Sequence, residues 1–186
     1  MLDRMKIQNR RALLMMVYLG FCVSALEAAQ DQARKFQFEE FPTNVYRGRF
    51  HIPKGLRKVD GEWLDYGGKP AAPPEVTFAG EYYLTAHSCG TDCRYYQLSN
   101  LRIGAEIREV SMFDAAEPLP VTSDGHPYLT VLYQRPDSRL LIAEYHLDLD
   151  NPKKAETCRQ RYYILTEGKL KPISKTFPFC TEEREQ

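Results

Sequence analysis

The chain has 186 residues, 43% of them hydrophobic, and its 25 basic side chains balance 25 acidic ones. This length suffices for one domain once a targeting segment is removed, and the composition is too apolar for a disordered chain. Because residues 1–25 hold four basic residues and one acid, the rest of the chain keeps 21 basic and 24 acidic residues, a net charge of −3. A mildly acidic body is not attracted to phosphates, so no nucleic-acid partner is predicted.

Residues 1–29 have the order of a secretory signal peptide. A basic stretch, residues 1–11, precedes the apolar run Ala12–Ala25, and small residues follow at Ala28 and Ala29. The apolar run is shorter than the roughly 20 residues of a transmembrane helix, although an uncleaved anchor remains the alternative. We therefore expect a periplasmic or secreted protein that meets the membrane only transiently, through its signal peptide.

Residues 30–75 are predicted to form N-terminal strands followed by a loop rich in proline and glycine. Alternating residues over 36–41 and 44–52 indicate two candidate strands, the first interrupted by Pro42. Turn signals such as Asp60-Gly61 then predict a surface loop over residues 58–75.

Residues 76–186 are predicted to form a disulfide-stabilised β domain. Strand patterns separated by turn signals occur at residues 78–86, 94–101, 105–113, 128–133, 139–147, 158–165 and 170–173. Turns are expected between them at residues 100–104, 135–138, 150–153 and 167–169. The sequence therefore predicts an all-β fold, an antiparallel meander that forms a two-sheet sandwich or a partial barrel, with residues 30–186 as one domain.

Four cysteines, Cys89, Cys93, Cys158 and Cys180, remain after removal of the signal peptide. An even number in an oxidising compartment predicts two disulfides, for which three connectivities are open. A Cys89–Cys93 bond requires a turn, which Gly90 and Asp92 suit, and this pairing leaves Cys158 to bond Cys180. We favour these two bonds, with the crossed pairings as alternatives.

Two functional interpretations of the cysteines are weaker than a structural one. A redox-active pair usually has two intervening residues, whereas Cys89 and Cys93 have three. His87 with Cys89 and Cys93 would give zinc three ligands, but the sequence shows no fourth nearby.

The other polar residues show no catalytic motif. The four histidines, His51, His87, His126 and His146, fall on different predicted elements, and Asp148 and Asp150 near His146 are typical of a hairpin end. Each tyrosine pair (Tyr82-Tyr83, Tyr95-Tyr96 and Tyr162-Tyr163) should place one ring on either face of a strand. No catalytic residue, metal ligand or cofactor is predicted.

Several segments resemble a family of small, uncharacterised exported bacterial proteins with a FAGxY…CGxxC signature and a closing RYY strand. They are Phe78-Ala-Gly-x-Tyr, Cys89-Gly-Thr-x-Cys93 and Arg161-Tyr-Tyr. Ser88 and Leu165 depart from the residues usual in that family, which are glycine and tryptophan. The resemblance implies export and a disulfide turn, and it transfers no catalytic residue to this chain.

The predicted function is that of a non-enzymatic binding or interaction module with an envelope protein as partner. The absence of a catalytic motif, together with export and many tyrosines, favours this interpretation. The alternative is a periplasmic hydrolase or zinc enzyme whose site assembles only in the fold.

Overall fold

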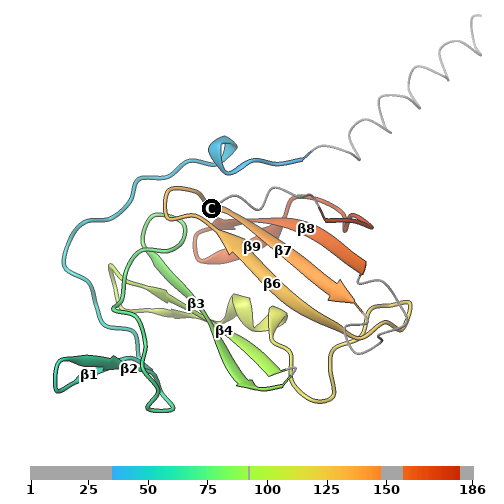
Figure 1. Ribbon diagram of the computed structural model, residues 1–186. Coiled ribbons are helices and arrows are strands. Elements are labelled where there is room, and N and C mark those ends of the chain that lie inside the picture. The colour runs from blue at the N-terminus through green and yellow to red at the C-terminus, as the bar shows by residue number, and fades with distance from the viewer. Residues whose placement is uncertain (1–34, 92, 148–156, 181–186) are drawn as a thin grey trace, which may run out of the picture. The chain divides into compact units, whose positions relative to one another are not determined.

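The computed structural model describes residues 35–91, 93–147 and 157–180 (Figure 1). The predicted signal peptide and the predicted turn at residues 150–153 lie outside these residues. The contacts of residues 37–186 group them into one compact unit. Over the described ranges, no helix is both long enough and apolar enough to cross a bilayer.

The described part of the chain is all-β, which confirms the predicted fold class. Its strands form three antiparallel sheets in which consecutive strands are neighbours, and none of the sheets closes into a barrel. The two-stranded sheet contains β1 (Arg57–Val59) and β2 (Glu62–Leu64). The three-stranded sheet contains β3 (Tyr82–Gly90), β4 (Cys93–Asn100) and β5 (Glu106–Ile107). The four-stranded sheet contains β6 (Tyr128–Gln134), β7 (Leu140–Leu147), β8 (Thr157–Thr166) and β9 (Lys169–Pro172).

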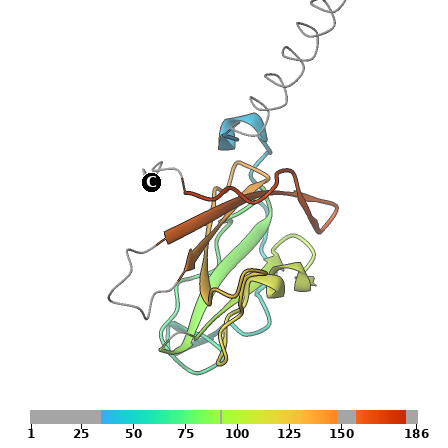
Figure 2. The same ribbon diagram turned by 90° about the vertical axis from the view of Figure 1, so that its right-hand side faces the viewer.

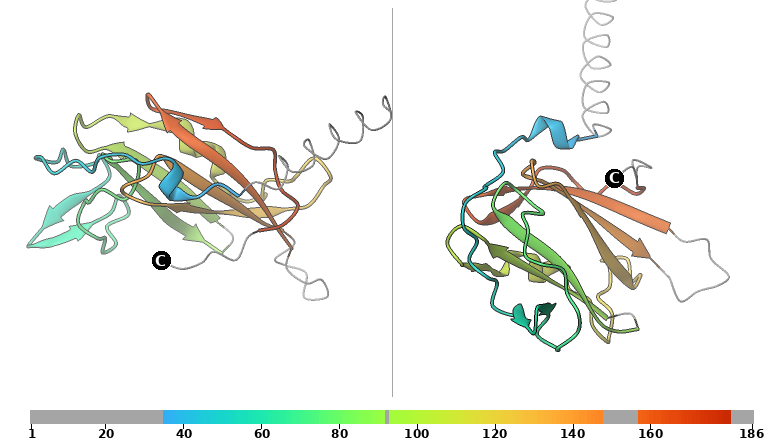
Figure 3. Two further views of the ribbon diagram at one scale, coloured as in Figure 1. Left: turned by 90° about the horizontal axis from the view of Figure 1, so that it is seen from above. Right: turned by 60° about the vertical axis from the view of Figure 1, so that its left-hand side comes forward.

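The core lies between the three-stranded and the four-stranded sheet. In Figures 2 and 3 the green strands of the first and the orange strands of the second form two layers. Leu84 and Leu98 from one layer and Leu141 and Ala143 from the other belong to one buried apolar cluster. Alternation along each strand directs these residues inward, so the opposite face of each sheet carries a separate set of side chains.

The segment Phe78-Ala-Gly forms a turn where a strand was predicted. Ala79 and Gly80 have φ of 46° and 80°, and Phe78 bridges Tyr82 directly. A Cβ on Gly80 would lie 2.5 Å from the carbonyl oxygen of Asn44, so this position requires glycine. Strand β3 therefore begins only at Tyr82.

The predicted strand at residues 105–113 is wrong over most of its length. Only Glu106 and Ile107 pair with β4, and the 3-10 helix η2 (Arg108–Phe113) follows. Val110 and Phe113 are both buried, and their i, i+3 spacing places them on one face of a 3-10 helix. The apolar residues that suggested a strand therefore reach the core from a helical turn.

The two N-terminal strands predicted at 36–41 and 44–52 are also absent from the structure. The 3-10 helix η1 (Phe38–Glu40) occupies the first, and the second is extended chain without a partner strand. Its backbone forms isolated hydrogen bonds to the body, such as Tyr46 N–H to Gly80 O at 2.6 Å. Alternation alone did not make a strand here, because no neighbouring strand completes a hydrogen-bonded ladder.

The hairpin of β1 and β2 begins one residue before the predicted loop at residues 58–75 and otherwise lies within it. Asp60 and Gly61 connect the strands with φ of 50° and 93°, the geometry of a type I′ turn, which favours Asp-Gly. Figure 1 shows this hairpin at the end of the chain segment that leads from η1.

Candidate functional site

Both predicted disulfides are present. The Cα atoms of Cys89 and Cys93 lie 5.0 Å apart, and those of Cys158 and Cys180 lie 5.4 Å apart. The first bond closes the turn between β3 and β4, and the second joins β8 to the C-terminal segment. The crossed connectivities are thereby excluded in this structure.

The zinc site considered for His87, Cys89 and Cys93 is not supported. Both sulfur atoms are bonded to each other, so neither is a thiolate that a zinc ion could bind. The His87 ring stacks on Tyr95 at a centroid distance of 4.7 Å, and its Nε2 lies 3.1 Å from the Thr85 hydroxyl. His87 thus has a structural role on the surface of the sheet.

The paired tyrosines fit the predicted placement on opposite strand faces, but the burial of the two rings differs from pair to pair. Tyr96 is buried while Tyr95 is 38% exposed, as expected for rings on opposite faces. Tyr162 and Tyr163 are both buried, because both faces of β8 are covered at this point. The paired tyrosines therefore do not form a continuous exposed aromatic stripe.

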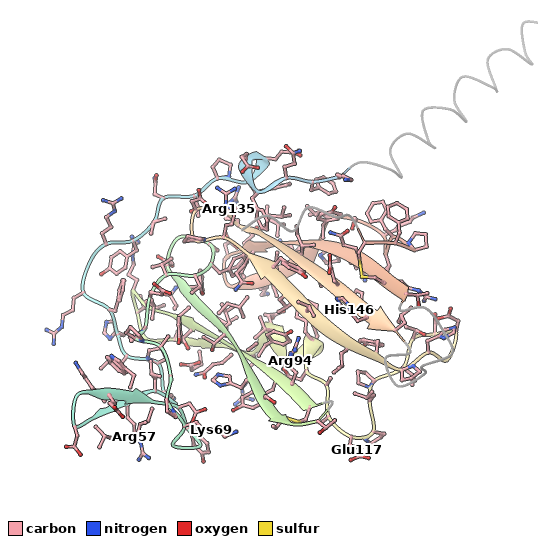
Figure 4. All side chains as sticks on the ribbon, viewed as in Figure 1. Arg57, Lys69, Arg94, Glu117, Arg135 and His146 are labelled. Carbon is pink, nitrogen blue, oxygen red and sulfur yellow. A yellow bond between two sulfur atoms is a disulfide. The ribbon has the colours of Figure 1, made fainter. Side chains whose placement is uncertain are left out.

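A cluster of polar side chains lies on the face of the four-stranded sheet opposite the core. Glu144 and His146 are two residues apart on β7 and share this face, whereas Ala143 and Tyr145, on either side of Glu144, contact the core. The register of β7 and β8 places Cys158 directly opposite His146. We call Glu144, His146 and Cys158 the Glu–His–Cys cluster; Figure 4 labels His146 within it.

The members of the Glu–His–Cys cluster are close together and largely shielded from water. The Glu144 and His146 side chains are 4% and 13% exposed, and Oε2 of the first lies 3.3 Å from Nε2 of the second. This is ion-pair distance, but the two atoms are not aligned as a hydrogen bond, and Glu144 Oε2 accepts none from any other group in the described part of the chain. One potential ligand atom from each of the three residues falls within 4.8 Å of the others.

The disulfide limits what the Glu–His–Cys cluster can do in the oxidised protein. The Cys158 sulfur is bonded to Cys180 and offers neither a nucleophilic thiolate nor a good metal ligand. Two ligands then remain, whereas zinc enzymes use three protein ligands and an open position. Asp148 and Asp150, which the sequence assigned to a hairpin end near His146, lie outside the described residues.

The remaining histidines do not join this cluster. His126 lies 3.8 Å from Asp124 at the start of β6, and Asp124 binds Arg159 of β8 through two hydrogen bonds. The Arg159 guanidinium holds the pKa of Asp124 well below its ordinary value, with a further contribution from Thr122. His51 packs beside Gly104 in the turn after β4.

A second candidate surface is formed by the residues between Phe41 and Val59. We call this segment, residues 41–59, the basic arm, because it contains five exposed cationic side chains and no carboxylate: Arg47, Arg49, Lys54, Arg57 and Lys58. Among the described ion pairs, none involves these five side chains. Figure 4 shows Arg57 at the hairpin, with Lys69 nearby.

The basic arm is fixed to the body by backbone hydrogen bonds at several points. Thr43 N–H donates to Asp137 O, His51 N–H to Leu101 O, each at 2.8 Å, and Lys54 N–H donates to the Glu106 carboxylate. That carboxylate also accepts hydrogen bonds from Ser99 and Gln97, so β4 and β5 position it. The cations of the basic arm are therefore presented on a largely fixed backbone.

Neither the Glu–His–Cys cluster nor the basic arm was predicted from the sequence, for identifiable reasons. The net charge of −3 for the body conceals the basic arm, which a charge count over a window of about twenty residues would have revealed. The Glu-x-His pattern at residues 144–146 shows that both side chains share a strand face. Its proximity to Cys158, however, depends on the register of β7 with β8, which no short motif specifies.

Comparisons of the chain with protein-family models, with curated proteins and with solved structures give no match.

Proposed function

We propose that this protein is an exported, non-enzymatic binding module whose basic arm docks on an acidic segment of an envelope protein. The observation that carries the proposal is the run of five exposed cations in residues 41–59 without a carboxylate among them. None of the ion pairs of the described residues neutralises these cations, and such a cationic surface attracts acidic ligands and accelerates their association.

The backbone attachment of the basic arm supports a role in binding. Tyr46 N–H and His51 N–H are both bonded to the body, so the arm does not have to be ordered when a partner arrives. Such preorganisation reduces the entropic penalty of association. Arg102 adds to the support, because its guanidinium lies over the Tyr46 ring at 4.8 Å and forms an ion pair with Glu81.

Exposed apolar side chains next to the cations favour a polypeptide partner. Ile52 is 56% exposed, Val59 42% and Tyr66 89%. Within the described sheets, β1 pairs only with β2, so its outer edge can accept a further strand. An extended acidic segment would meet cations, apolar contacts and backbone hydrogen-bonding groups together, whereas a lipid headgroup would use only the cations.

Export is supported by the two disulfides, which persist in oxidising compartments such as the periplasm. A zinc enzyme or hydrolase is the less supported alternative. The Glu–His–Cys cluster is the one group of three or more close candidate metal ligands in the described ranges, and its sulfur is occupied by a disulfide.

Poly-L-glutamate of defined length is a suitable probe for the proposal. We expect the oxidised protein to bind it in an isothermal titration and the affinity to fall as salt is raised. Replacing Arg47, Arg49 and Lys54 together by glutamine should weaken binding at least tenfold.

The matched control carries the same loss of charge on another surface. Lys169, Lys171 and Lys175 are exposed on and after β9, and their combined replacement by glutamine should leave binding within about twofold. Equal losses in the two triple variants would contradict a role for the basic arm. Binding of anionic phospholipid vesicles that depends on the arm and is stronger than binding of the polypeptide would overturn the proposed partner class.

A further inference from the structure

The Glu–His–Cys cluster combines the three kinds of ligand atom found in zinc sites. Glu144 supplies carboxylate oxygen, His146 imidazole nitrogen and Cys158 sulfur, all from the paired strands β7 and β8. In a tetrahedral site with bonds of about 2.0–2.3 Å, ligand atoms lie roughly 3.3–3.8 Å apart. The three candidate ligand atoms lie within 4.8 Å of one another. To reach tetrahedral spacing they therefore have to approach by only about 1 Å, which side-chain rotations can supply.

Burial of Glu144 favours a positively charged occupant at this position. Its side chain is 4% exposed, and no group of the described residues donates a hydrogen bond to Oε2, which lies 3.3 Å from His146 Nε2 within the Glu–His–Cys cluster. A buried carboxylate oxygen without a donor is energetically unfavourable, and a bound cation would satisfy it. The surrounding strands are fixed, because β7 is hydrogen-bonded to β6 on one side and β8 on the other.

We propose that reduction of the Cys158–Cys180 disulfide converts the Glu–His–Cys cluster into a zinc site. Glu144, His146 and Cys158 are the three protein ligands, and water takes the fourth position. The oxidised protein has no such site, because the Cys158 sulfur is bonded to Cys180. The disulfide therefore acts as the switch that makes the third ligand available.

The chemistry requires a dithiol or phosphine reductant from outside the protein. A dithiol gives two electrons and two protons to the disulfide, its own sulfurs form a new disulfide, and Cys158 and Cys180 become thiols. Zinc then displaces the proton of the Cys158 thiol to solvent, and a zinc–sulfur bond forms.

The C-terminal segment would stay attached to β8 after reduction. Gln160 and Phe177 exchange two backbone hydrogen bonds, at 3.1 and 2.8 Å, and Ile173 N–H donates to Tyr162 O at 3.0 Å. The Phe177 ring also packs edge-on against Tyr162. Opening the disulfide therefore releases Cys180 from Cys158 without removing the strand pairing that positions the Glu–His–Cys cluster.

The sharpest test uses Cys180→Ser. In this variant Cys158 has no disulfide partner, so it is a thiol without the addition of a reductant, and the Cys89–Cys93 bond is kept. All chains in the test are full length and also carry Cys22→Ser, so that Cys22 adds no thiol. Thiol counting on the Cys180→Ser chain must then give one free thiol per chain. We expect this variant to bind one zinc ion per chain after dialysis against chelator. Cobalt should give a sulfur-to-metal charge-transfer absorption, which reports a thiolate ligand.

The controls separate the proposed site from adventitious binding. The oxidised parent chain and Cys158→Ser, which keeps the Cys180 thiol, should bind no stoichiometric zinc. Adding His146→Ala to Cys180→Ser should weaken zinc binding at least tenfold while circular dichroism shows the fold retained. Equal zinc binding by Cys158→Ser and Cys180→Ser would overturn the proposal, as would cobalt binding without the charge-transfer band.

A second variant of the chain tests the proposal if Cys180→Ser does not fold. The double variant Cys89→Ser/Cys93→Ser contains Cys158 and Cys180 alone, and can be purified oxidised and then reduced with a phosphine. Zinc binding that appears only after reduction supports the proposal, and no binding in either state contradicts it. Variants of the basic arm should bind zinc normally, so the two proposals can fail independently.

Discussion

Tyr96 donates its hydroxyl hydrogen to the carbonyl oxygen of Thr130 across a distance of 2.6 Å, and this bond joins the two main sheets. Tyr96 belongs to β4 and Thr130 to β6, and the bond is buried. The same carbonyl accepts a longer bond, at 3.3 Å, from the Arg94 guanidinium. Apolar packing between the layers is non-directional, so these polar links help fix their relative position.

Tyr96→Phe should lower the free energy of unfolding by about 1–2 kcal/mol, because it removes the donor and leaves a buried carbonyl with one weaker bond. Chemical denaturation followed by circular dichroism measures the change. Tyr95→Phe is the matched control on the opposite face of β4, where the ring is 38% exposed, and should change stability by less than about 0.5 kcal/mol. Equal effects of the two substitutions would show that the bond between the sheets contributes little.

Gly80→Ala should destabilise the protein for two separable reasons. The added Cβ would adopt an unfavourable positive φ and would also lie 2.5 Å from the Asn44 carbonyl oxygen. The clash should displace the basic arm, since Tyr46 N–H is bonded to the carbonyl of Gly80. Thermal unfolding and hydrogen exchange at Tyr46 would measure the two consequences.

Gly125→Ala isolates the effect of a positive φ from that of a steric clash, because Gly125 has φ of 86° and no atom within 4 Å of an added Cβ. It should cost about 1–2 kcal/mol through backbone strain alone. Gly80→Ala should cost about 2 kcal/mol more, as expected for overpacking. If both variants lost equal stability, the close approach of the basic arm to Gly80 would be unimportant.

Acid should weaken the link between Asp124 and Arg159. The folded-state pKa of Asp124 is lowered, so its contribution to stability is complete above its ordinary value near 4 and is lost as pH falls toward the folded pKa. Asp137 contributes in the same direction, because Arg135 lowers its pKa. Unfolding free energy measured between pH 6 and pH 2 should therefore decline below about pH 4.

Asp124→Asn should make that decline shallower. Asp60→Asn is the control, because it removes the same charge from the hairpin turn, where the described contacts give Asp60 no ion pair. An unchanged acid slope in Asp124→Asn would contradict the inferred coupling. Raised salt should reduce the difference between the variants, since Asp124 is exposed and its ion pair is screened.

The strands that were predicted well are those with a strong apolar pattern between clear turns. Residues 128–133 and 139–147 correspond closely to β6 and β7, because the Arg135–Ser138 turn separates two runs that pair with each other. The preferred cysteine pairing was also correct, because a local turn satisfied one pair and left the other. In these cases a local pattern and the final packing require the same conformation.

The errors arose where the outcome depended on distant neighbours. Residues 44–52 alternate like a strand, yet none of the described strands pairs with them, so they form an extended segment held by isolated bonds. The Glu–His–Cys cluster depends on the register that brings Cys158 opposite His146. A single sequence specifies periodicity within a segment, but it does not state which segments become neighbours.

The bond between Cys158 and Cys180 also makes a closed covalent ring of the chain between them, and this ring contains β8 from Cys158 onward and all of β9. A protease that cuts once anywhere in the ring therefore liberates no fragment, and the molecule gains only the mass of one water. The nick becomes visible as two separate pieces when the protein is both reduced and denatured. The C-terminal part of the protein can thus be cleaved in an oxidising medium and still remain one molecule.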